Sequence, residues 1–163
     1  MLNKTSAMHC FIVSLFLLAS LLATNGLAEE GIKPEAGDRC AVCGMMVLPY
    51  PNWIAQVVFK DGTNRFFDGP KDMFTFIFDL ETYQPGSKID DIRNVYVTEY
   101  YTVQRYDARD VFFVEGSNVS GPMGDEYVPV AGAQALETFV RDHGRKKVLR
   151  YDDAQLTPVV PQP

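Results

Sequence analysis

The chain has few side chains that can bind a transition metal or form a disulfide, with three cysteines and two histidines among 163 residues. Cys10 lies at the start of an N-terminal apolar run, which leaves Cys40 and Cys43 for the rest of the chain. A disulfide closing so short a loop restrains the unfolded chain only weakly, so a structural disulfide is a poor explanation of this pair. Structural zinc is disfavoured as well, because a tetrahedral Cys/His site needs a second pair of ligands. Redox chemistry and binding of a soft metal remain.

Positive charge is also scarce. The chain has 15 Lys and Arg against 21 Asp and Glu, for a formal net charge of −6 at pH 7. Proteins that bind nucleic acids neutralise phosphates with a basic face, so this balance excludes that class of partner.

Only one long hydrophobic run occurs, at residues 10–23. Lys4 precedes it, and small residues and the triplet Gly26-Leu27-Ala28 follow it, which is the layout of a secretory signal. The run is shorter than the roughly 20 apolar residues that span a bilayer comfortably. We therefore expect a signal peptide at 1–28 and export to the periplasm. No cysteine lies between the run and Cys40, so a lipid anchor is not evident.

The patterning that follows predicts one α+β domain. Residues 29–39 are polar and contain glycine and proline, which is typical of a flexible lead-in. Residues 53–60 and 63–67 suit two strands, because an Asp-Gly turn joins them. A helix then begins near residue 70, since apolar residues recur at helical spacing as far as residue 80. We expect this helix to pack its Met/Phe stripe onto the hairpin.

The second half of the chain repeats this order. Strands are predicted at 95–103, 111–114, 127–130 and 148–151, with a loop at 116–124. A predicted helix stops at Gly144 and carries on one face Leu136, Phe139, Val140 and His143. We expect two ββα-type halves packed as one compact domain over residues 40–154, followed by a loose tail at 155–163.

The chemistry concentrates in residues 40–46, CAVCGMM, which hold two potential thiolates and two thioethers. Soft sulfur ligands of this kind favour Cu(I) over Mg, Ca or Mn. A thiolate must lose a proton to bind the ion, whereas a thioether has none to lose. For Met45 and Met46, spacing alone does not decide between metal ligand and core filler.

Three further side chains have competing interpretations. Met123 lies between glycines in a polar loop, which offers little core for it to fill and favours a ligand role. Met73 falls on the helical stripe and is interpreted as core filler. His143 could add a nitrogen ligand, but its place at a helix C-terminus favours capping.

Taken together, these residues resemble the nitrous oxide reductase accessory protein family, NosL. The resemblance rests on an ordered set: Cys40-x-x-Cys43-Gly44-Met45, Phe67-Asp68 before a helix, Pro122-Met123-Gly124, and Ala135-x-x-x-Phe139-x-x-x-His143-Gly144. It implies a fold of two ββα halves and a Cu(I)-binding chaperone that supplies copper for maturation of periplasmic nitrous oxide reductase.

The chain departs from that family in two respects. Its members are typically lipoproteins with an anchor cysteine, and they tend to have His-Gly-Gly where this chain has His143-Gly144-Arg145.

Two functions follow as hypotheses. The first is a metallochaperone that is not an enzyme, takes no small-molecule substrate, and binds Cu(I) through Cys43, Met45 and Met123, with Cys40 as an additional or alternative thiolate. Its partner would be nitrous oxide reductase, the membrane-bound machinery that matures it, or a related cuproprotein. The second is a thiol-disulfide oxidoreductase that uses the Cys40/Cys43 pair. It is the weaker hypothesis, because such a motif should open a helix after a strand.

Overall fold

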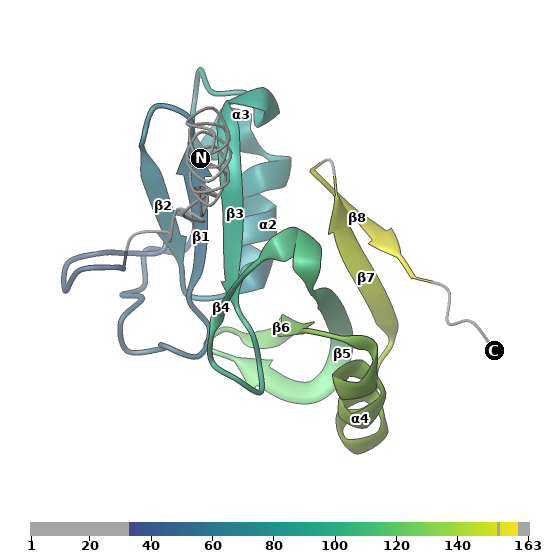
Figure 1. Ribbon diagram of the computed structural model, residues 1–163. Helices are drawn as coiled ribbons and strands as arrows, with labels where there is room; N and C mark the ends of the chain where they lie inside the picture. The colour runs from purple at the N-terminus through teal and green to yellow at the C-terminus, as the bar shows by residue number, and fades with distance from the viewer. Residues whose placement is uncertain (1–32, 153, 160–163) are drawn as a thin grey trace, which may run out of the picture. The chain divides into compact units, whose positions relative to one another are not determined.

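The computed structural model describes residues 33–152 and 154–159, so the predicted signal peptide and the start of the lead-in lie outside the described residues. Two four-stranded antiparallel sheets and a few helices make up this part of the chain, which confirms the α+β class (Figure 1).

The first sheet has the strand order β2-β1-β3-β4. Its strands are β1 (Ala55–Phe59), β2 (Asn64–Phe67), β3 (Ile92–Thr98) and β4 (Arg105–Asp107). Between β2 and β3 lie α2 (Pro70–Phe78), α3 (Leu80–Tyr83) and the 3-10 turn η1 (Ile89–Asp91), and η2 (Ala108–Asp110) leads to the second sheet.

The second sheet has the equivalent order β6-β5-β7-β8. Its strands are β5 (Phe112–Gly121), β6 (Gly124–Val130), β7 (Lys147–Asp152) and β8 (Gln155–Pro158), with α4 (Ala133–His143) between β6 and β7. Each half is therefore larger than the predicted ββα unit, because two more strands follow its helix in the same sheet.

Helix α2 lies between the two sheets in the core. Phe76 on one face makes edge contacts with Phe59 and Phe67 of the first sheet, at ring-centroid distances of 6.3 and 5.1 Å. Phe74 on another face contacts Phe113 of β5, with ring centroids 4.9 Å apart. The predicted contact with the hairpin is confirmed, and the helix is also buried from the other side.

Met73 is fully buried in this same core cluster, which confirms its interpretation as core filler.

The structure corrects three of the predicted boundaries. The loop expected at 116–124 is mostly strand, because β5 continues to Gly121 beyond an irregularity between Glu115 and Ser120. The strand expected at 95–103 ends at Thr98. The expected loose tail begins with β8, which pairs with β7.

No helix within the described ranges is long and apolar enough to cross a membrane.

Candidate metal centre

A short closed loop presents the two cysteines. The backbone N–H of Cys40 donates to the Met45 carbonyl at 2.7 Å, and that of Gly44 donates to the Cys40 carbonyl at 3.0 Å. Gly44 has a φ of 77°, a left-handed conformation that glycine adopts without the Cβ penalty of other residues. These bonds fold residues 40–46 into a turn rather than the first turn of a helix.

This loop is attached to the first sheet. Cys40 forms a parallel bridge with Phe66 of β2, and the Ala41 N–H donates to the Phe66 carbonyl at 3.0 Å. As a result, Cys40 is 3% exposed, whereas Cys43 is exposed at the surface, and both thiols are free.

Two aspartates complete the group. Asp68 directly follows β2 and is 1% exposed, and Asp72 lies in the first turn of α2. The Cys40 thiol donates to Asp72 Oδ2 at 3.2 Å, and the Cys43 thiol donates to Asp68 Oδ1 at 3.4 Å. One ligand atom from each of these four residues lies within 4.8 Å of the other three, which is close enough for one metal ion to contact all of them. We call these four residues the Cys/Asp cluster.

The second carboxylate oxygen of Asp68 distinguishes this cluster from a group of side chains that only satisfy one another's hydrogen bonds. Asp68 Oδ2 is buried and has no hydrogen-bond partner within the described part of the chain. Leaving a buried carboxylate oxygen unpaired costs free energy unless a ligand compensates it. A cation in the cluster would supply that compensation.

The thiols are protonated in this environment. Burial raises the pKa of Cys40 far above its ordinary value, and the carboxylate of Asp68 raises it further. Burial also raises the pKa of Cys43, and the carboxylates of Asp72 and Asp68 add to this effect. Since a metal binds the thiolate, a bound ion would have to displace the proton of each thiol that it binds.

A family model for NosL matches residues 31–158, which is most of the chain.

The chain belongs to the NosL family.

Two proteins similar to this NosL-family chain have names that specify copper. The copper-binding lipoprotein NosL of Stutzerimonas stutzeri is 26% identical over 155 residues, which cover 84% of this chain and 77% of the relative. The crystal structure of the copper chaperone NosL from Shewanella denitrificans matches with a TM-score of 0.64 at 23% identity, over 76% of this chain and 94% of that one. The second likeness shows that the fold is shared.

The cluster contains Cys40 and Cys43, whose role as ligands stays a prediction, and two carboxylates that the sequence analysis does not predict as ligands. The sequence points to Asp68 only through the Phe67-Asp68 motif that resembles the NosL family, and it gives no comparable sign for Asp72. Asp68 directly follows a strand and Asp72 lies in the first turn of the next helix, so their spacing of four is a signal. Only the fold brings them to the cysteines 25 and 32 positions earlier.

The two predicted thioether ligands, Met45 and Met123, are residues that are partly or largely exposed. Met45 is half-buried in the cysteine loop, and Met46 is 43% exposed. Met123 is 52% exposed in the two-residue turn between β5 and β6. That hairpin approaches the start of α2, since Lys71 Nζ donates to the Asp125 carbonyl at 2.6 Å. The role of Met45 and Met123 as ligands stays a prediction.

His143 has a different neighbourhood. Its Nδ1 lies 2.9 Å from Asn118 Oδ1, and its ring packs on Phe139 with centroids 4.7 Å apart. Gly144 caps the helix with a φ of 71°. His143 thus contacts Asn118 and Phe139 at the end of α4, and its capping role stays a prediction.

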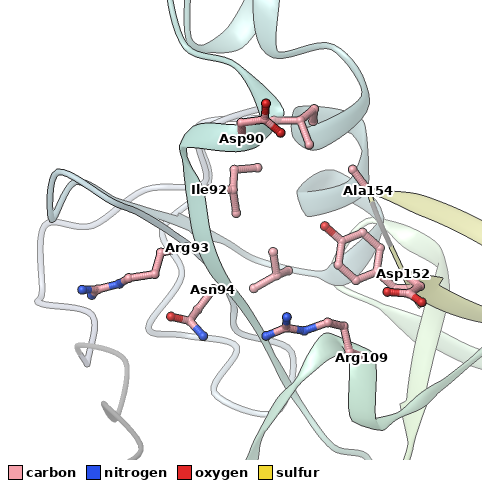
Figure 2. A pocket seen from close by; sticks show the side chains of 10 residues that line it. Asp90, Ile92, Arg93, Asn94, Arg109, Asp152 and Ala154 are labelled. Carbon is pink, nitrogen blue, oxygen red and sulfur yellow. The ribbon is translucent and has the colours of Figure 1, made fainter.

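A separate pocket of about 380 Å³ lies beside β3 and the β7–β8 turn (Figure 2). Of the described residues that line it, none is a cysteine, methionine or histidine, and Arg109 there is paired with Asp107 at 2.6 Å. It therefore offers no soft ligand, and the Cys/Asp cluster is the candidate site.

Proposed function

We propose that this chain is an exported Cu(I) chaperone that binds one ion at the Cys/Asp cluster and passes it to a partner protein. The observation that carries the proposal is the convergence of two thiols on two carboxylates, one of which has a buried oxygen without a partner. Two relatives whose names specify copper support the choice of metal.

The hydrogen bonds within the cluster indicate how the ion would enter. Each thiol donates a hydrogen bond to one carboxylate, so each thiol proton lies beside a carboxylate, where positive charge is favoured. Cu(I) would replace a thiol proton with a soft cation, and the aspartates would keep the local charge favourable for it.

The proposed ligands are Cys43, Met45 and Met123, with Cys40 as an additional or alternative thiolate. Because Cys43 and Met123 are exposed and Met45 is half-buried, one side of the ion would stay open to a partner. The site thus suits transfer, which needs binding without full enclosure, and no catalytic step is required.

The recipient we propose is nitrous oxide reductase or the membrane-bound machinery that matures it, in the periplasm. This rests on family membership and on the predicted signal peptide. The Stutzerimonas stutzeri relative is named a lipoprotein, so attachment to the membrane is a second route to the same location.

The oxidoreductase alternative has less support. A nucleophilic cysteine in a Cys-x-x-Cys motif needs a lowered thiol pKa and commonly opens a helix. Here burial raises the pKa of both thiols, and the pair lies in a turn that forms isolated bridges to neighbouring backbone.

Anaerobic titration of the reduced protein without its signal peptide tests the proposal. We expect one Cu(I) per chain to survive competition with a chelator of known affinity, and copper X-ray absorption to show a sulfur-dominated shell. Absence of bound Cu(I) above the level of a Cys40→Ala/Cys43→Ala double variant would remove the chaperone function. Disulfide reductase turnover of the metal-free protein would favour the alternative.

A further inference from the structure

Glu126 is a buried carboxylate on β6 that the proposed function does not use. It is 7% exposed and lies three residues after Met123. Its Oε1 accepts a hydrogen bond from the backbone N–H of Lys71 at 2.5 Å and another from the N–H of Tyr127 at 2.8 Å. Lys71 directly precedes Asp72, so this one carboxylate joins the β5–β6 hairpin to the segment that carries both aspartates of the cluster.

The backbone around Glu126 leaves room for that carboxylate and little else. A Cβ at Gly69 would collide with the carboxylate, and a Cβ at Gly121 would lie only 3.1 Å from the Glu126 side chain. Both glycines flank the junction, one beside Asp68 and the other at the end of β5. The two segments therefore approach more closely than chains with side chains at these positions would.

The same junction sets the position of the Met123 turn. Gly121 pairs with Gly124 across the hairpin, so Pro122 and Met123 form a two-residue connection. Short connections of this kind have few conformations, and the place of the turn follows from the strands that it joins. Fixing β6 at Glu126 thus fixes the turn relative to α2.

We propose that Glu126 is a positioning residue, which holds the Met123 turn at the Cys/Asp cluster and so allows the thioether to reach the metal. Glu126 itself is no ligand, because it lies outside the group of four residues whose ligand atoms converge. This inference rests on the proposed function. It identifies Glu126 as the side chain that connects the β5–β6 hairpin with the start of α2.

The first test is a double-mutant cycle on Cu(I) affinity, measured by chelator competition. Glu126→Ala should weaken binding roughly 10- to 100-fold, the range seen when a residue that orients a metal ligand is removed, and copper X-ray absorption should lose one thioether scatterer. Glu126→Gln keeps an oxygen that can accept from both N–H groups, so it should bind within about twofold of the wild type. In the Met123→Ala background, Glu126→Ala should cause no further loss, because its effect passes through that methionine.

The matched control is Glu99, a second buried carboxylate that accepts backbone hydrogen bonds from Tyr101, Thr102 and Ala131 at 3.0, 2.7 and 3.3 Å. Glu99→Ala should lower stability and leave the thioether signal intact. A loss of affinity in Glu126→Ala that persists in the Met123→Ala background, or unchanged affinity in the single variant, would overturn the inference. Glu126→Asp, which withdraws the carboxylate by one methylene, replaces the alanine variant if that variant does not fold.

The second test needs no copper and separates this inference from the proposed function. In the metal-free protein, Glu126→Ala should raise hydrogen–deuterium exchange at residues 120–127 more than elsewhere, while Glu126→Gln should not. Equal protection of this hairpin in wild type and Glu126→Ala would overturn the positioning role. If wild-type protein bound no Cu(I) but the hairpin were released as described, the chaperone function would fail while the structural role of Glu126 stood.

Discussion

The thiol of Cys43 donates to the carboxylate of Asp68 across 25 positions of sequence, with Sγ and Oδ1 3.4 Å apart. Cys43 lies on an exposed turn, whereas Asp68 is 1% exposed at the end of β2. This pairing connects the accessible edge of the cluster with its buried base. A metal ion from solvent would meet Cys43 first and then reach Asp68, whose Oδ2 has no hydrogen-bond partner within the described part of the chain.

Asp68→Asn tests whether that buried charge serves metal binding. Asparagine keeps the shape and can still accept from Cys43, but it removes the negative charge. We expect Cu(I) affinity to fall by about tenfold or more, and Zn(II) affinity to fall further, because carboxylate oxygens matter more to a harder ion. Chelator competition with each metal measures both.

The matched control for Asp68→Asn is Asp125→Asn on the exposed hairpin, which removes the same charge outside the cluster. Equal losses in the two variants would mean that Asp68 acts only through net charge.

The two cysteines should differ when each is replaced by serine. Cys40 is 3% exposed within the core cluster, so Cys40→Ser should lower the free energy of unfolding by about 1–3 kcal/mol, the cost of a buried polar group with imperfect partners. Cys43→Ser should leave the stability of the metal-free protein unchanged and abolish tight Cu(I) binding. Denaturant unfolding and copper titration of each variant measure these effects, and equal copper losses would instead indicate a site that needs both thiolates.

Met123→Ala should separate a ligand from a packing residue. Met123 is 52% exposed, so the melting temperature of the metal-free protein should barely change, while Cu(I) affinity and the copper-induced rise in melting temperature should both decrease. Met46→Ala is the control, since Met46 is 43% exposed beside Met45 and is not among the proposed ligands. A Met46 variant that loses more affinity than the Met123 variant would show that Met46, and not Met123, supplies a thioether ligand.

Glu126 should make the stability of the metal-free protein depend on pH. Burial raises its pKa from 4.5 to about 7 in the folded protein. The unfolded chain ionises first, so the stability that this side chain contributes is complete below pH 4.5 and is lost as pH rises to about 7. Relative to Glu126→Gln, the wild type should lose on the order of 3 kcal/mol across this window. Denaturant unfolding at pH 5 and pH 8 measures the difference, and parallel stability profiles would show that Glu126 titrates normally.

The secondary structure was largely predictable where local patterns decide it. The helix at Pro70–Phe78 follows from its apolar spacing and initial proline, and α4 ends at the predicted Gly144. The predicted boundaries were wrong where pairing between neighbouring strands decides them. The segment 116–121 is polar and glycine-containing, yet it forms strand because β6 supplies its hydrogen bonds.

The sequence by itself determined the α+β class, the family, and the two cysteines of the candidate site, because periodicity and short motifs depend on neighbours along the chain. Only the tertiary structure decided that Asp68 and Asp72 join them and that Glu126 connects the second half. These are contacts over 25 to 55 positions. They exist because α2 is buried between two sheets, which brings its first turn to the cysteine loop on one side and to the β5–β6 hairpin on the other.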